Sequence, residues 1–354
     1  MKEPKAAPPP APEALPLFFR EILGQERVIA NLMTAWRQGR LAHAYLFLGP
    51  DGVGKASVAR ALAGALNCAQ PLSDGDACGA CPSCRRLAAG VHPDFLVIAT
   101  TSEGHQPQIK IEQIREFRRL TGYPPVGGGW RVALIKPAEA LNDASANSLL
   151  KTLEEPPARN LLVLTAGGEA DLFPTVVSRC QKLAFAPLPS ALVAQELEKR
   201  RGLGKAQAAL LAALSGGSLG RALTLKPEEL LSQRRQVLND LEQLSQGSAT
   251  AVLDWAGRLT KSRADLDSFL LLAQLWYRDL LLLNFQAPHH LLAHQDCLAD
   301  LERERAQGAA PKWFANFNAL RAAHRHLQAN LNPELTLNIL GLRLQGRGQV
   351  HEPR

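Results

Sequence analysis

The chain has 354 residues, enough for two or three domains of ordinary size. Its apolar fraction of 46% and charged fraction of 21% are those of a globular protein, and they exclude disorder along the whole chain. The 40 Lys and Arg against 33 Asp and Glu leave a net charge of +7. This mild excess favours contact with nucleic acid without being a signature of DNA binding.

The first 16 residues are rich in Pro and Ala and contain no continuous apolar run. We predict a disordered tail over 1–16 and no signal peptide. The long apolar run from Phe269 to Phe285 carries Arg278 and Asp279 near its middle, so it predicts a buried helix and not a membrane span. These features predict a cytoplasmic protein whose six cysteines do not form disulfides.

Three domains are predicted from the pattern of apolar residues. Over 17–187, short apolar runs alternate with helical stretches, which predicts a parallel sheet covered by helices. Residues 188–227 predict a small helical domain, and the apolar spacing over 228–345 predicts a third, all-helical domain before a tail at 346–354. In the first domain we expect strands at 44–48, 95–98, 132–135 and 161–165, and helices at 57–67, 111–120 and 144–153.

The first expected strand runs into a glycine-rich turn and then a helix, which is the context of a phosphate-binding loop. The backbone N–H groups around Gly49, Gly52 and Gly54 would cradle phosphates, and Lys55 would reach the β and γ oxygens. The sequence therefore predicts a P-loop nucleotide-binding fold.

The residues that would hydrolyse the nucleotide are missing from this pattern. The residue after the loop lysine should hold Mg²⁺ through a hydroxyl, but it is Ala56, and Ser57 lies about 100° further around the helix. The strand that should end in paired carboxylates ends in Lys136-Pro137. Losing one general base lowers the rate about 10²–10⁴-fold, and here the ligands of Mg²⁺ are lost as well. We therefore predict that this chain does not turn over ATP with Mg²⁺. A carboxylate displaced to Glu139 is the alternative.

Four cysteines follow the loop with the spacing C-x₉-C-x₂-C-x₂-C: Cys68, Cys78, Cys81 and Cys84. Short C-x₂-C steps present two thiolates from one turn, and four thiolates suit tetrahedral Zn²⁺. A closed four-ligand site leaves no position for chemistry, so the sequence predicts a structural zinc module over 68–84. Free cysteines or a redox pair are the alternative.

A second metal site could be imagined from three histidines and a cysteine near the C-terminal part of the chain, His289, His290, His294 and Cys297. We prefer a solvated loop after Pro288.

The sequence resembles the clamp-loader subunits of bacterial DNA polymerase III, which are AAA+ proteins. The resemblance rests on Ser178-Arg179-Cys180, on the segment LLKTLEEPP at 149–157, on the zinc module, and on Ile22-Leu23-Gly24-Gln25 and His43-Ala44-Tyr45. It covers most of 17–225. It implies an α/β RecA-like AAA+ P-loop domain with a Cys₄ zinc insertion, then a small helical lid domain and an all-α collar domain.

Departures from the family pattern indicate which kind of subunit this is. Motor subunits keep a hydroxyl after the lysine, a carboxylate pair and a lid sensor arginine, whereas this chain has Ala56, Lys136-Pro137 and Gly220, with Arg221 one place late. Ser178-Arg179-Cys180 survives. The combination resembles the delta-prime class, the non-hydrolysing stators of the loader.

By this resemblance, Arg179 is an arginine finger that acts in trans on the neighbouring ATP site. A local ion pair at a strand start is the alternative. Glu154 and Glu155 are interpreted as packing and interface residues and not as catalytic groups.

The resemblance also implies the partners. These are the gamma/tau motor subunits, the delta subunit, the sliding clamp indirectly, and primed DNA through its phosphate backbone; no membrane is expected. Static binding of a nucleotide at 49–55 stays open. Two other functions remain as alternatives: a gamma/tau-type motor or other AAA+ ATPase, and a zinc-dependent DNA-binding module on a vestigial ATPase fold.

Overall fold

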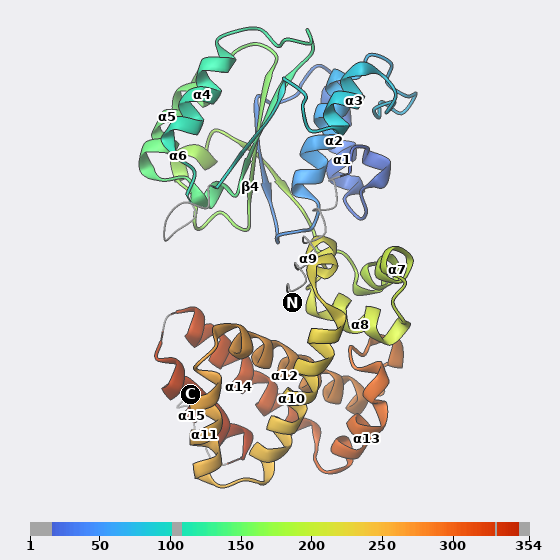
Figure 1. The fold of residues 1–354 in the computed structure, drawn as a ribbon, viewed down its shortest axis with the longest axis vertical. Helices are drawn as coiled ribbons and strands as arrows, with labels where there is room; N and C mark the ends of the chain where they lie inside the picture. Colours follow the sequence, from blue (N-terminus) through green and yellow to red (C-terminus); the bar gives the residue numbers. More distant parts are fainter. Residues whose placement is uncertain (1–15, 101–107, 330, 347–354) are drawn as a thin grey trace, which may run out of the picture. The chain divides into compact units, whose positions relative to one another are not determined.

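The computed structural model describes residues 16–100, 108–329 and 331–346. The chain divides into two compact units, one ending at Pro187 and the other beginning at Leu188 (Figure 1). The predicted tails at 1–16 and 346–354 lie almost entirely outside the described residues.

The first unit is built on a five-stranded parallel sheet with the strand order β2-β3-β4-β1-β5. Its strands are β1 (Ala44–Leu48), β2 (Phe95–Ala99), β3 (Arg131–Lys136), β4 (Asn160–Ala166) and β5 (Gln181–Ala184). In register, Ala44 lies opposite Leu162 of β4, and Tyr45 lies opposite Gln181 of β5. The predicted parallel α/β sheet is therefore confirmed, with β5 in addition to the four expected strands.

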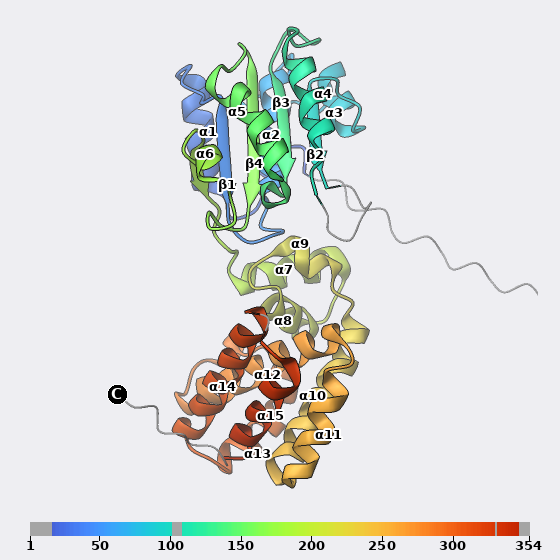
Figure 2. The ribbon, with the colours of Figure 1, turned by 90° about the vertical axis from the view of Figure 1, so that its left-hand side faces the viewer.

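Helices cover both faces of this sheet (Figure 1; Figure 2). One face carries α1 (Glu26–Arg37), α2 (Lys55–Asn67) and α3 (Pro82–Ala88), and the other carries α4 (Ile111–Thr121), α5 (Asp143–Glu154) and α6 (Pro174–Val177). Successive strand residues point to opposite faces, so Tyr45 and Phe47 join one core while Ala44 and Leu46 join the other. The central strands are thus buried on both sides, as parallel sheets require.

The ends of α5 show how local chemistry sets the position of later functional residues. The Asn142 side chain accepts a hydrogen bond from the N–H of Ser145 and caps the start of the helix. The helix ends at Glu154, because Pro156 has no N–H and disfavours a helical conformation at the residue before it.

The second unit is helical throughout its described residues. Its helices are α7 (Ser190–Arg201), α8 (Lys205–Leu214), α9 (Leu219–Thr224), α10 (Pro227–Gln246), α11 (Ala249–Leu259), α12 (Arg263–Asn284), α13 (Leu298–Ala306), α14 (Ala310–Gln328) and α15 (Pro333–Leu344). The helix α12 packs against α10, α13 and α14 and buries Phe269, Trp276 and Leu280. A boundary at residue 227 between lid and collar domains stays a prediction.

The expected buried helix over 269–285 is confirmed as most of α12, in which Asp279 is fully buried. None of the helices in the described ranges combines the length and the hydropathy needed to cross a membrane.

Candidate functional site

The phosphate loop and Arg179 lie at two opposite edges of the sheet. The glycine-rich loop follows β1 and therefore lies at the carboxyl edge, whereas Arg179 precedes β5 and lies at the amino edge. At about 3.3 Å per residue, the length of β1 alone separates these edges by roughly 13 Å. In this chain, Arg179 and the loop belong to different sites.

The loop has the backbone that a phosphate cradle needs. Gly49, Gly52 and Gly54 have φ values of 149°, 75° and 107°, a region that side chains with a Cβ rarely adopt. At Gly49 space is limiting as well, because a Cβ would lie 2.5 Å from the carbonyl oxygen of Phe185. Gly54 forms the N-cap of α2, so the first N–H groups of that helix face the loop.

Lys55 is the first residue of α2 and is only 6% exposed. Its Nζ donates to the carbonyl oxygens of Gly49 and Pro50, the latter at 3.0 Å, and lies 3.4 Å from Asp51 Oδ1. The structure thus brings the four predicted loop residues together, with the ammonium group held inside the loop. The next residue, Ala56, packs against the apolar core.

Gln25 supports the loop, a role that its sequence context did not indicate. This side chain is 2% exposed, and its Nε2 donates to the carbonyl oxygens of Val53 at 3.2 Å and Ala186 at 2.8 Å. It therefore ties the phosphate loop to the segment that follows β5.

The strand β3 ends in a lysine, at the position where a hydrolysing P-loop protein would have a pair of carboxylates for the metal. Lys136 is the last residue of β3, and Glu139 follows in a short 3₁₀ turn. One oxygen of Glu139, Oε1, accepts a hydrogen bond from the N–H of Gly167 at 2.5 Å, just beyond β4. Glu139 therefore lies at the carboxyl edge, where it holds the main chain after β4.

Arg179 lies between α6 and β5, with its backbone N–H bonded to the carbonyl oxygen of Val176. Its Nη1 donates to the Thr175 carbonyl oxygen at 3.0 Å, and its Nη2 donates to Glu154 Oε1 at 2.7 Å. The side chains of Arg179 and Glu154 are 37% and 50% exposed. The ion pair that the sequence left as an alternative is thus present, and the guanidinium also remains open to solvent.

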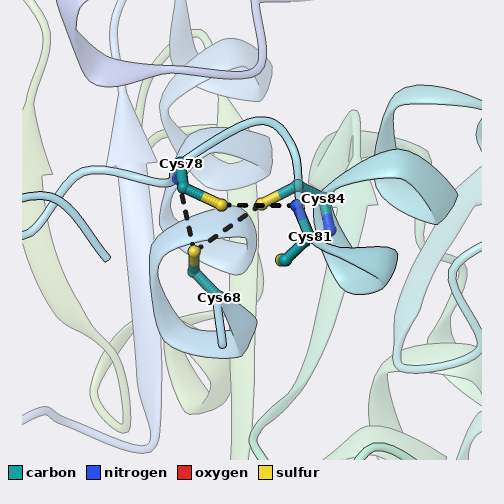
Figure 3. Close-up of side chains that lie close together, drawn as sticks. All are labelled: Cys68, Cys78, Cys81 and Cys84. Carbon is teal, nitrogen blue, oxygen red and sulfur yellow. Dashed lines mark hydrogen bonds between the residues drawn. The ribbon is translucent and has the colours of Figure 1, made fainter. Parts of the chain in front are cut away.

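The four predicted cysteine ligands converge between α2 and α3 (Figure 3). Their sulfur atoms all lie within 4.8 Å of one another, and those of Cys68 and Cys84 are 3.7 Å apart. A tetrahedron with metal–sulfur bonds of about 2.3 Å has edges of roughly 3.8 Å. The spacing of these sulfur atoms therefore suits a metal ion.

Backbone N–H groups also point at the sulfur atoms, as expected where thiolates must be stabilised. The N–H groups of Cys78, Cys81 and Cys84 donate to the Sγ atoms of Cys68, Cys78 and Cys81, at 3.3, 3.4 and 3.4 Å. Burial opposes ionisation of Cys81, but hydrogen bonds from Cys84 and Ala69 prevail and lower the pKa of its thiol to about 6. Burial raises the pKa of Cys84.

Comparisons with known proteins show what the first unit is similar to. Residues 24–189 match the family model described as DNA polymerase III, delta subunit. The DNA polymerase III subunit delta′ of Pseudomonas aeruginosa is 40% identical over 205 residues, which are 57% of this chain and 61% of that protein. Residues 24–189 of the chain are thus similar to clamp-loader subunits of DNA polymerase III.

Other subunits of DNA polymerase III are also similar to the chain. The DNA polymerase III subunit tau of Escherichia coli is 35% identical over 227 residues, 63% of this chain and 34% of that protein. The chain thus spans about three fifths of the delta′ relative and about a third of the tau relative. A solved gamma subunit-related protein from Thermotoga maritima is 18% identical with a TM-score of 0.39, covering 90% of this chain and 99% of that one.

Asp76 joins the cysteine cluster to the segment that precedes α1. Its carboxylate is 3% exposed and accepts hydrogen bonds from the N–H groups of Phe19, Arg20 and Ala77. Phe18 packs beside the cysteines, and a Cβ on Gly79 would lie 2.7 Å from its ring. No spacing in the sequence linked residues 57 positions apart, so Asp76 was missed.

The second candidate metal site does not form within the described part of the chain, where the four cysteines are the cluster suited to a metal. His289 and His290 are exposed, whereas His294 is fully buried with its Nδ1 at 2.9 Å from Asp279 Oδ2. The expectation of a solvated loop after Pro288 is therefore wrong for Leu292–His294. This segment is buried because Asp279 accepts hydrogen bonds from its N–H groups.

Proposed function

We propose that this chain is the delta-prime subunit of the DNA polymerase III clamp loader, a stator that does not hydrolyse ATP. In the cytoplasm it assembles with the gamma/tau motor subunits and with the delta subunit. The complex opens the sliding clamp, which this chain affects indirectly, and places it on primed DNA. DNA contacts of this chain go to the phosphate backbone and are independent of sequence.

The position of Arg179 is the observation that carries this proposal. It lies at the amino edge of the sheet, away from the phosphate loop of its own chain, and its guanidinium is partly exposed. An arginine supplied by one subunit can stabilise the charge that develops on the γ-phosphate bound to its neighbour. A subunit can therefore lose its own catalysis and still be required for catalysis next to it.

The loss of catalysis in this chain follows from the residues at the carboxyl edge of its sheet. Ala56 offers no oxygen to Mg²⁺, and Lys136 brings a positive charge to the end of β3. Lys55 is already bonded to the loop carbonyls. Gly49, Gly52, Gly54 and Lys55 keep the shape of a degenerate cradle, which permits static binding of a nucleotide without turnover.

We assign Zn²⁺ as the metal of the four-cysteine cluster, with a structural role. Cys68, Cys78, Cys81 and Cys84 supply four sulfur atoms at tetrahedral spacing, and a complete set of protein ligands leaves no site for a substrate. The metal would fix α3 and the loop before it against α2.

ATP turnover by the purified chain, alone and then with the motor and delta subunits, tests the proposal. We expect no turnover by the chain alone and a stimulated ATPase in the complex. Arg179→Ala should keep assembly intact and lower turnover at the adjoining site by up to about 10³-fold. Arg119→Ala, which removes another exposed ion-paired arginine of the same unit, is the matched control.

Two outcomes would contradict the proposal. Complex turnover that is unchanged by Arg179→Ala would remove the finger assignment. Turnover by the chain alone would favour a gamma/tau-type motor, the second candidate, which the 35% identity to the E. coli tau subunit supports.

A further inference from the structure

Arg179 already has a carboxylate partner within its own chain. Glu154 is the last residue of α5, and Arg179 lies 25 residues later, between α6 and β5. The 2.7 Å contact joins Arg179 Nη2 to Glu154 Oε1, while Nη1 is bonded to the carbonyl oxygen of Thr175 at 3.0 Å. One end of the guanidinium is thus held by the main chain and the other by a charge.

The position of Glu154 favours this pairing. A carboxylate at the C-terminus of a helix faces the negative end of the helix dipole, which disfavours it unless a cation lies nearby. Arg179 supplies that cation. The next residue, Glu155, is exposed and makes no ion pair among the described residues, so the contact is specific to Glu154.

The ion pair is also easily exchanged. Its side chains are 37% and 50% exposed, and exposed pairs of this kind change an equilibrium constant by no more than about fivefold. The phosphate groups of a bound nucleotide together carry more negative charge than a single carboxylate. Arginine binds their oxygens with strong charge-assisted hydrogen bonds. A nucleotide on a neighbouring subunit can therefore displace Glu154 while the Thr175 contact stays in place.

We propose that Glu154 is a positioning residue that pairs with Arg179 in the free subunit and is displaced by the nucleotide of the neighbouring subunit. This inference rests on the finger role proposed above. Glu154 keeps the guanidinium of Arg179 ordered at the amino edge before assembly. It also makes Arg179 slightly less ready to bind at a neighbouring ATP site that is empty or wrongly placed. The exchange affects binding of the nucleotide and leaves the chemical step unchanged.

The test is the steady-state KM and kcat for ATP of the reconstituted complex carrying Glu154→Gln, with Glu155→Gln as matched control. Glutamine keeps the size and an oxygen acceptor but removes the charge. We expect KM at the site adjoining this chain to fall about two- to fivefold with kcat unchanged, because no ion pair must be broken. The control should match wild type. An unchanged KM, or a lower kcat, would overturn the proposal.

The same substitution in an Arg179→Ala background separates this role from a merely structural one. If Glu154 acts through Arg179, Glu154→Gln should have no further effect there, and an equal fall in KM would overturn the inference. If Arg179→Ala lowers turnover but Glu154→Gln matches its control, only the role of Glu154 is lost. If Arg179→Ala changes nothing, the proposed finger is lost and this role with it.

Discussion

At the scale of single residues, Cys81 of the cluster differs from Cys180 in its surroundings. Cys81 has a thiol pKa of about 6 because backbone N–H groups stabilise its thiolate against the opposing effect of burial. Cys180, which lies outside the cluster, has its thiol pKa raised to about 12 by burial. A metal ion requires thiolates, and the lowered pKa of Cys81 supplies one in the cluster, whereas burial raises the pKa of Cys68 and of Cys84.

Replacing one cysteine ligand tests the metal site. In Cys81→Ser, a site with three remaining thiolates should lose most of its metal, so that zinc measured by elemental analysis falls from about one per chain to a small fraction of that. Because the metal would hold α3 against α2, the free energy of unfolding should fall as well. Cys297→Ser is the control and should keep its zinc. A full zinc content in Cys81→Ser would contradict the four-cysteine assignment.

The spacing of the cysteines made this site predictable, since all four lie within 17 positions of one another in the sequence. The contact between Glu154 and Arg179 could not be predicted in the same way. Their 25-residue separation has no period, and only the return of the chain through β4 and α6 brings them together.

At the scale of elements, a buried charge cluster joins α12 to the segment before α13. Asp279 and His294 are both fully buried, and Arg278 Nη2 lies 2.7 Å from Asp279 Oδ1. Burial alone would raise the pKa of Asp279, but the hydrogen bond and charge of His294, together with Arg278, lower it below its usual value. The ionised carboxylate therefore stabilises the helical unit.

We expect this contribution to disappear in acid. A carboxyl group with a lowered pKa in the folded chain stabilises the fold above its unfolded pKa, near 3.9, and the effect is lost as the pH falls through the folded value. In Asp279→Asn the free energy of unfolding at pH 7 should fall by about 3–5 kcal/mol, because the partners His294 and Arg278 are left without the carboxylate that compensates them. Urea unfolding of the full chain between pH 7 and pH 3, followed by tryptophan fluorescence, measures both effects.

The control for this prediction lies on the same helix. Asp267 forms an exposed ion pair with Arg263 at 3.2 Å, so Asp267→Asn should change the free energy of unfolding by less than about 1 kcal/mol. The loss of stability in acid should be shallower in Asp279→Asn than in wild type. Equal pH profiles of the free energy of unfolding for Asp279→Asn and wild type would show that Asp279 is not the group that titrates.

The elements themselves were largely predictable, because long apolar runs and helical spacing fix their type. The strand over 44–48 has the predicted bounds, and the helix predicted over 111–120 ends one residue later, at Thr121. The strand β5 was missed because it has only four residues, Gln181–Ala184, of which two are polar and three are exposed, so no apolar pattern marks them. Its pairing with β1 depends on the tertiary fold.

At the scale of the whole molecule, the chain combines a phosphate loop that keeps its shape with an exposed arginine at the other edge of the same sheet. Gly49 and Gly54 retain backbone conformations that favour glycine, although Ala56 and Lys136 remove the expected means of holding Mg²⁺. Retention of the loop has a structural explanation. Lys55 bonds α2 to the loop, and Gln25, just before α1, bonds to the loop and to the segment after β5.

If the loop serves the fold and not the reaction, removing its charge should spare the activity of the complex. In Lys55→Met, the buried methylene stem is kept while the ammonium group is lost from the carbonyl oxygens of Gly49 and Pro50. We expect complex ATPase to stay within about twofold of wild type, in contrast to the large loss in Arg179→Ala, with a decrease of about 1–3 kcal/mol in the free energy of unfolding. Both quantities must be measured, since the second shows that the substitution reached its target. A large loss of ATPase in a stably folded Lys55→Met complex would mean that a nucleotide bound at this loop is required, and the stator would then bind nucleotide as part of its function.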